Sequence, residues 1–414
     1  MNCIKGFRQT MPENVLQKVS IAMLCLAGLA FPFSVAATNA GLAATLLLSL
    51  FSGDFRRGSQ LLWQHYTTLA IAFLLLIGLM ILSLAWSPDF IEGLDKIGHL
   101  WFLLLLPVLN SLLQHEPYRK AFLLSLSIAL TAHLGYCVVQ ASGLFHIEIA
   151  SAASNPDDPA GHIGHIGFGF VYGLWAGWLI MHSLHHRGWE RWLPLALALW
   201  AVVMVFIVQG RGGYLVVLAI SLAIIWKEWI HGRLSKRLPW FIGSFALLLM
   251  ALAMGPGQHR VQQTWQQLQQ AESGDIRHAE ARLPLWISAF KAWQEKPWLG
   301  YGVGGFLSAT QSVHVTHPEL ETPHLVHPHN IYLLAMVREG VIGLMSLLAV
   351  LFFWLHAGWR MNWLHSPAGY LIAAPALALM VNGMTSSSLE EHYSGIIAII
   401  FLACGLAIAS KEAA

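Results

Sequence analysis

The sequence contains few charged residues. Only 11% of its 414 residues are Asp, Glu, Lys or Arg, whereas a soluble domain carries about 25%. Hydrophobic residues make up 56% of the chain, and its mean hydropathy is +0.59. Apolar runs such as 67–86 are long enough to cross a bilayer and are apolar on every face, unlike the alternating pattern of spanning strands. We therefore expect an all-α integral membrane protein.

Cysteine and nucleotide-binding motifs are also scarce. The four cysteines, at positions 3, 25, 137 and 404, fall in the N-terminal tail or in apolar runs, and none forms a CxxC pair. A structural disulfide or a redox role is therefore not expected. The chain has no P-loop, no GxGxxG motif in a βαβ context and no basic patch, which argues against nucleotide and nucleic-acid binding.

The chain contains twelve apolar stretches that are long enough to span a membrane. They lie at 15–33, 35–52, 67–86, 97–114, 120–143, 165–184, 192–209, 212–231, 239–255, 335–357, 366–386 and 394–411. Most connections between them are short, so we expect one bundle of about twelve transmembrane helices. An even number of spans places both termini on one side of the membrane. If that side is the cytoplasm, most Lys and Arg lie in cytoplasmic loops, as expected for a membrane protein.

One connection, 256–334, is much longer than the others and lies on the outer side. It divides the chain into 1–255 with nine spans, this loop, and 335–414 with three spans. Connections of this length are usually functional or disordered, and this composition does not indicate disorder. Apolar residues follow Arg282 at 283, 285, 286, 289, 290 and 293. This spacing predicts an amphipathic helix, which is followed by a glycine-rich turn at 300–306.

Three arginines stand out on the outer side. Arg211 lies in "VQGRGGYLV" at the end of a span, where a guanidinium costs several kcal/mol unless an anion pairs with it. Its flanking glycines favour access for a bulky anion over simple snorkelling. Arg260 and Arg282 lie in the long loop, where a single arginine would be a solvated charge. Together the three predict a clamp for a phosphate or pyrophosphate.

Histidines gather on the same side. His329 and Asn330 open the segment that enters the tenth span, where a histidine can accept a proton from a hydroxyl and Asn330 can cap the helix or orient a ligand. The nearby loop histidines at 314, 317, 324 and 327 also permit a zinc site. However, no tight pair of carboxylate and histidine ligands supports it, so we expect no metal.

Two further clusters lie at outer helix ends. His162 and His165 are three residues apart in "GHIGHIGFGF" and are expected to share a helix face, either bonded to backbone or lining the site. Glu390 and Glu391 lie between the last two spans. A carboxylate there can act as a general acid or base, or it can form an ion pair with an arginine. We favour the ion pair.

Taken together, these motifs resemble one family. "HNIYLLAMVREGVIG" reads as His-Asn, nine residues, Gly340, two residues and Gly343. "RGGYL" and "RLPLW" place Leu215 and Trp286 four residues after an arginine, and the glycine-rich turn comes before the His-Asn pair. This order resembles the O-antigen ligase and polymerase superfamily of bacterial envelope assembly, over most of the chain.

The resemblance implies a GT-C-like membrane glycosyltransferase that uses no metal and no cofactor. A ligase of this family transfers a polysaccharide from undecaprenyl pyrophosphate to a sugar hydroxyl of lipid A–core oligosaccharide, at the periplasmic face of the bacterial inner membrane. Its roles map onto His329 as general base and onto Arg211 and Arg282 as stabilisers of the pyrophosphate. Arg260, Asn330, His162 and His165 are expected to bind substrate, and membrane lipid surrounds the bundle.

Three alternatives remain open. The polymerase of the same superfamily uses a second carrier-linked repeat as acceptor, and a related enzyme transfers glycans to protein hydroxyls. An anion or lipid transporter is the alternative from another class. Transporters are often built from repeated halves, whereas the long loop here has no counterpart in the first half and the unusual polar residues gather on the outer side.

Overall fold

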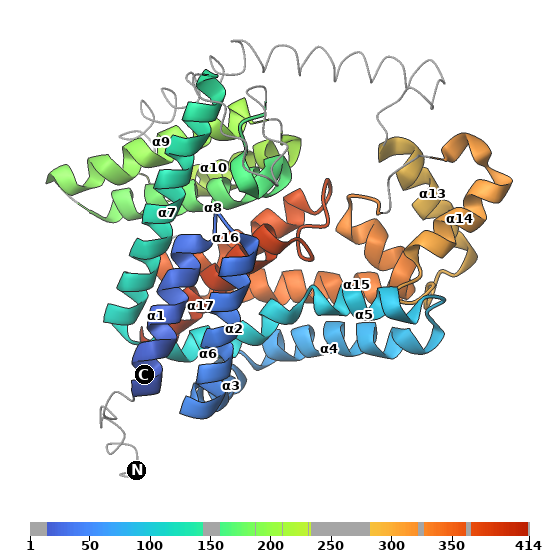
Figure 1. The fold of residues 1–414 in the computed structure, drawn as a ribbon, viewed down its shortest axis with the longest axis horizontal. Helices are drawn as coiled ribbons and strands as arrows, with labels where there is room; N and C mark the ends of the chain where they lie inside the picture. The colour runs from blue at the N-terminus through green and yellow to red at the C-terminus, as the bar shows by residue number, and fades with distance from the viewer. Residues whose placement is uncertain are drawn as a thin grey trace.

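The computed structural model describes residues 15–143, 158–186, 188–208, 210–230, 232, 282–321, 327–361 and 366–412. All regular secondary structure in these residues is helical (Figure 1). Seven helices there are long and apolar enough to cross a membrane, which agrees with a helical membrane protein. The predicted ninth span at 239–255 and Arg260 lie outside the described residues, and the total of twelve spans stays a prediction.

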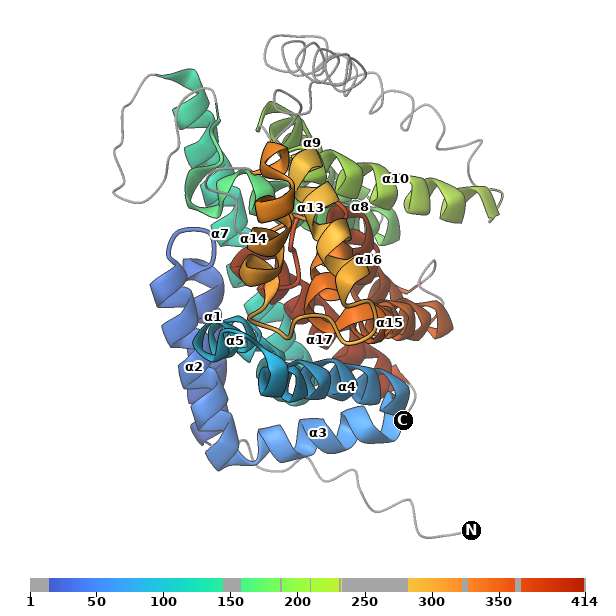
Figure 2. The same ribbon diagram turned by 90° about the vertical axis from the view of Figure 1, so that its right-hand side faces the viewer.

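The N-terminal helices form one side of the bundle. Helix α1 (Val15–Ala30) packs against both α2 (Val35–Ser52) and α7 (Glu116–Ser142), whereas α4 (Thr67–Ser83) packs along α15 (Ile331–Arg360) (Figures 1 and 2). Helix α3 (Asp54–His65) connects these two groups. The side chain of Ser34 accepts a hydrogen bond from the Ala37 amide and so caps α2.

The prediction of one spanning helix at 97–114 is wrong. The chain instead forms α5 (Phe90–Gly98), a 3-10 helix (Trp101–Leu104) and the short helix α6 (Leu105–Leu112). Pro107 lies in the first turn of α6, where a residue without an N–H group is tolerated, so the proline fits a new helix start here. Its carbonyl packs directly against Gly58 of α3. The apolar composition does not reveal this interruption.

The centre of the bundle consists of α8 (Gly164–His185), α10 (Arg211–Ile230), α16 (Pro367–Asn382) and α17 (His392–Glu412), with α9 (Trp192–Ile207) outside α8. Helix α17 is buried along almost its whole length. Glycines let the backbones of α8 and α10 touch, since a Cβ on Gly213 would lie 2.5 Å from the Gly169 Cα. This contact brings the first residues of α8 and α10 to the same end of the bundle.

We call residues 282–321, which belong to the predicted outer loop, the outer segment. It contains α13 (Arg282–Glu295) and α14 (Phe306–Thr316), which lie beyond the end of α5 and α15 (Figure 1). The amphipathic helix predicted after Arg282 is confirmed. Its buried residues, Pro284, Leu285, Ser288, Ala289 and Ala292, only partly match the predicted apolar face, because Phe290 is 44% exposed. Leu285 and Ala289 pack with Phe306, Leu334 and Val337 in a hydrophobic cluster separate from the main core.

Helix α15 is interrupted at Gly340, whose φ of 68° and ψ of −158° are not helical. The chain at 297–302 crosses this break: the Gly302 amide donates to the Arg338 carbonyl (2.7 Å), and the Val341 amide donates to the Pro297 carbonyl (2.8 Å). A side chain at Gly340 would collide with the Trp298 carbonyl. The helix that contains the predicted tenth span thus begins earlier, at Ile331, and before the break its Leu334 and Val337 pack with α13 and α14.

Candidate functional site

His329 lies at the mouth of α15 in a strained backbone conformation. Its φ is 47°, and it is the single non-glycine residue with a positive φ in the described part of the chain. This left-handed conformation costs about 1 kcal/mol for a residue with a Cβ. The next residue, Asn330, is extended and caps α15, because its side-chain oxygen accepts from the amides of Tyr332 (3.0 Å) and Leu333 (3.1 Å). The predicted cap is thus confirmed.

The turn after α16, residues 383–387, holds this segment from one side. The Ile331 amide donates to the Gly383 carbonyl (2.8 Å), and the Asn330 side chain donates to the Met384 carbonyl (3.3 Å). The Ser387 hydroxyl lies 3.4 Å from Nδ1 of His327. Strain at His329 therefore persists because neighbouring residues are fixed to a separate element.

Burial keeps the imidazole of His329 neutral. Its pKa is lowered to about 4, mainly by desolvation and to a smaller extent by electrostatic interaction with His327, Arg282 and His165. Its Nδ1 is buried and has no hydrogen-bond partner among the described residues. The His327 ring lies 4.0 Å away, centroid to centroid. A neutral histidine is the form that can accept a proton from a hydroxyl.

The structure brings part of the predicted arginine clamp to this place. Arg282 is the first residue of α13, and its charge is close enough to lower the pKa of both His327 and His329. Arg211 is the first residue of α10, and Gly210 before it packs against the His165 carbonyl. The Arg211 side chain lies outside the described part of the chain, as Arg260 does.

The glycines around Arg211 have a different role from the predicted one. They were expected to leave space for a bulky anion. Instead, Gly210 packs against the His165 backbone, Gly212 against the Asn382 side chain and Gly213 against Gly169. These glycines allow the start of α10 to lie close to α8 and α16, because a residue without a Cβ permits such close approach.

The prediction that His162 and His165 share a helix face is also wrong. Gly164, with a φ of 71°, separates the 3-10 helix Gly161–Ile163 from α8. Nδ1 of His165 lies 3.1 Å from Asp158 Oδ2, and its charge acts on His329. The ring of His162 instead stacks on Tyr136 of α7, at 6.5 Å between centroids. Of the pair, the interaction with His329 is therefore made by His165.

A buried ion pair completes this end of the molecule. Nη1 of Arg338 donates to Glu390 Oε1 at 2.5 Å, and the two side chains are 4% and 20% exposed. This confirms the predicted pairing of Glu390 with an arginine. Sequence reasoning did not assign Arg338 to the site, although a charged Arg-Glu dipeptide inside an apolar run is a signal for a buried polar group.

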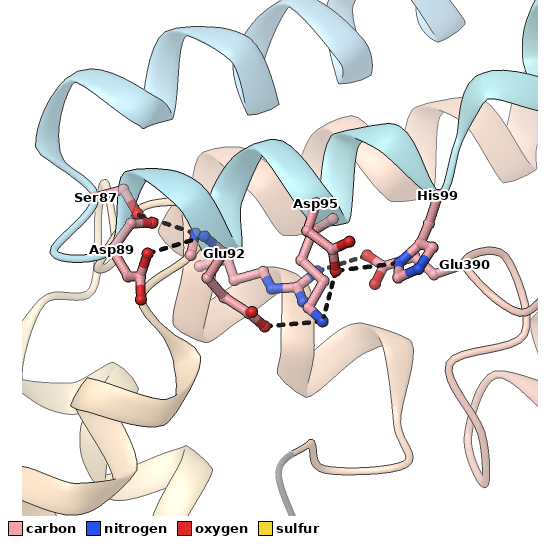
Figure 3. A network of polar contacts seen from close by, with 9 residues as sticks. Ser87, Asp89, Glu92, Asp95, His99 and Glu390 are labelled. Carbon is pink, nitrogen blue, oxygen red and sulfur yellow. Dashed lines mark hydrogen bonds and ion pairs between the residues drawn. The ribbon is translucent and has the colours of Figure 1, made fainter.

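A charged face on α5 adjoins the ion pair. Lys96 pairs with Glu92 (2.8 Å) and Asp95 (3.5 Å), and His99 lies 3.9 Å from Asp95. Figure 3 shows Glu92 and Asp95 projecting from α5, with His99 and Glu390 near the end of that helix. The charge of Lys96 also acts on His327, so α5 contributes to the electrostatics of the site. Sequence reasoning missed this contribution, although the spacing of Glu92 and Lys96 is that of a helical ion pair.

Glu391 organises the turn that holds His329. Its two carboxylate oxygens accept hydrogen bonds from the hydroxyls of Ser386 (3.0 Å) and Ser394 (3.5 Å), and burial raises its pKa. Ser386 in turn lies within hydrogen-bond distance of Ser388 (2.8 Å). These contacts face the turn itself and not the histidines, so Glu391 fixes the position of the turn.

One protein family model matches part of the chain. Residues 196–348 match the family model described as O-antigen ligase, which confirms the resemblance seen in the motifs. The matched segment includes Arg211, Arg282, His329 and Asn330. Among curated proteins, no match is found.

Proposed function

Starting from the O-antigen ligase match of residues 196–348, we propose that the protein transfers a polysaccharide from undecaprenyl pyrophosphate to a sugar hydroxyl of lipid A–core oligosaccharide. The observation that carries this proposal is the neutral, strained His329 beside the positive charge of Arg282. A base for a hydroxyl and a cation for a phosphate are the two groups that this reaction requires. No nucleotide pocket is needed, because a lipid pyrophosphate is already a good leaving group.

In the proposed reaction, His329 removes the proton from the acceptor hydroxyl while its oxygen attacks the anomeric carbon of the donor sugar. The bond between that carbon and the pyrophosphate oxygen breaks, and undecaprenyl pyrophosphate leaves with the bonding electrons. Arg211, Arg282 and Arg260 stabilise the negative charge that develops on the leaving group. Direct attack from the opposite side inverts the anomeric configuration.

The low pKa of His329 in the free protein fits this sequence of events. In the absence of donor, Arg282 and His327 help to keep the imidazole neutral. A bound pyrophosphate adds negative charge beside Arg282 and so offsets its effect on the histidine. Donor binding is therefore expected to raise the pKa of His329 and to make it a stronger base when the acceptor arrives.

Both substrates are lipids, so the proposed location is the bacterial inner membrane. The distribution of Lys and Arg supports cytoplasmic termini and a site that faces the periplasm. The seven long apolar helices of the described residues support a multi-pass arrangement. Asn330 and His165 are proposed substrate contacts at the site, whereas the stacking of His162 on Tyr136 argues against such a role for His162.

The test uses purified protein, carrier-linked glycan, lipid A–core and EDTA, with product detected by gel shift. We expect glycan on lipid A–core with the unaltered protein. His329→Ala should abolish transfer and retain donor binding, and Arg282→Ala should weaken both. His317→Ala is the matched control, because His317 is exposed and pairs with Glu319 on the outer segment.

Other outcomes would exclude either the ligase assignment or the assignment of the general base. Longer carrier-linked chains without lipid A–core product would identify the polymerase of the same superfamily. Glycan on a protein acceptor alone would identify the protein-directed transferase. Absence of every product from correctly folded protein would favour the transporter. Near-normal transfer by His329→Ala would contradict the assignment of the general base.

A further inference from the structure

Trp286 connects the outer segment to the histidine segment. It lies one helical turn after Arg282 on α13, and its indole Nε1 donates a hydrogen bond of 2.7 Å to the Pro328 carbonyl. Pro328 immediately precedes His329. The bond therefore joins two parts of the chain that are 42 residues apart, directly beside the proposed base.

The hydrogen bond acts on the peptide unit that defines the backbone angle φ of His329. The carbonyl of this unit accepts from Trp286, and its amide lies 3.4 Å from Nδ1 of His327. On the other side of His329, Asn330 and Ile331 are fixed to the turn after α16. Because φ and ψ of His329 are the rotations between these two anchored units, Trp286 holds one side of the left-handed conformation.

The orientation of the His329 side chain depends strongly on its backbone conformation. A catalytic histidine is often oriented by a hydrogen bond from its second ring nitrogen to a neighbouring group. Here Nδ1 of His329 has no such partner within the described residues. The direction of the imidazole is therefore set by its backbone and by the contact with the His327 ring.

We infer that Trp286 is a positioning residue for His329, and that α13 thereby aligns the base with the pyrophosphate-binding Arg282 on the same helix. The inference rests on the proposed function. The indole N–H is not needed to attach α13, because Leu285, Ala289 and Ala292 already pack against Leu334 and Val337 in the outer hydrophobic cluster. Removal of this N–H group should thus alter the backbone conformation at His329 without unfolding α13.

The test is Trp286→Phe, which keeps an aromatic ring and removes the indole N–H group. Trp293→Phe is the matched control, because Trp293 lies on the same helix and donates to another proline carbonyl, that of Pro297, at 3.1 Å. We expect Trp286→Phe to lower kcat about tenfold or more with the donor KM unchanged, since small displacements of a reacting group are costly. The thermal midpoint of each variant should stay close to that of the unaltered protein.

A second measurement does not depend on transfer activity. Modification of His329 by diethyl pyrocarbonate, followed by mass spectrometry as a function of pH, reports the pKa of this one histidine. Loss of the fixed conformation should expose the ring and raise its pKa from about 4 toward 6.5 in Trp286→Phe, but not in Trp293→Phe.

The two measurements separate failure of the inference from failure of the proposed function. If the two variants behave alike in both, Trp286 is not a positioning residue. If Trp286→Phe lowers kcat only together with the thermal midpoint, its role is structural and the inference is overturned. If the unaltered protein shows no transfer, the proposed function fails, and the modification experiment still decides whether Trp286 positions His329.

Discussion

Removal of the negative charge of Glu390 should destabilise the protein strongly. The Arg338 guanidinium is almost completely buried, bonds to Glu390 at 2.5 Å, and has a buried Nε without a hydrogen-bond partner in the described residues. Breaking a buried ion pair costs about 3–5 kcal/mol, because the remaining charge is left uncompensated. Glu390 keeps 20% of its side chain exposed, so we expect a smaller loss of about 2–3 kcal/mol for Glu390→Gln.

The measurement is denaturant unfolding of the purified protein in detergent micelles. Glu92→Gln is the matched control, because it removes an equivalent charge from an exposed pair with Lys96 and should cost less than about 1 kcal/mol. Replacing both partners, with Arg338→Met and Glu390→Leu together, should recover most of the lost free energy of unfolding, since an apolar pair needs no compensation.

Two results would refute this reasoning. Equal effects of Glu390→Gln and Glu92→Gln would show that burial does not strengthen the Arg338 pair. A double variant that is less stable than Glu390→Gln would show that the loss comes from altered packing and not from an uncompensated charge. Because Glu390 follows the turn that anchors Asn330 and Ile331, transfer activity should fall together with stability.

Two further predictions concern the base and the helix contacts. Because the pKa of His329 is lowered to about 4 and a base acts in its neutral form, kcat/KM should fall only as the pH drops through about 4. A tenfold loss of kcat/KM between about pH 7.5 and 5.5, with donor binding unchanged, would contradict this. His327→Gln should shift the fall of kcat/KM to higher pH, because it removes a group that lowers the pKa of His329. Gly213→Leu should abolish folding or activity, because its Cβ would lie 2.5 Å from another backbone, whereas Gly78→Ala, at an open position, should be tolerated in expression and transfer assays.

Local patterns were read correctly where near neighbours in the chain decide the structure. Within the described residues most apolar runs are helices, the spacing after Arg282 corresponds to α13, and Asn330 caps α15. Each of these depends on interactions within one or two turns, which the order of residues displays directly. Helix interruptions were missed, because Gly340 breaks α15 only where the chain at 297–302 crosses it and supplies hydrogen bonds.

By itself, therefore, the sequence determined a helical membrane chain, and it supplied the arginines and histidines to which we assign phosphate binding and proton transfer. Only the tertiary structure decided which of them meet. It brought Arg282 and His165 to His329, sent His162 toward Tyr136, and used the glycines beside Arg211 to join helices. The physical reason is that these contacts join residues far apart in the chain, and they depend on close backbone approach that no local periodicity encodes.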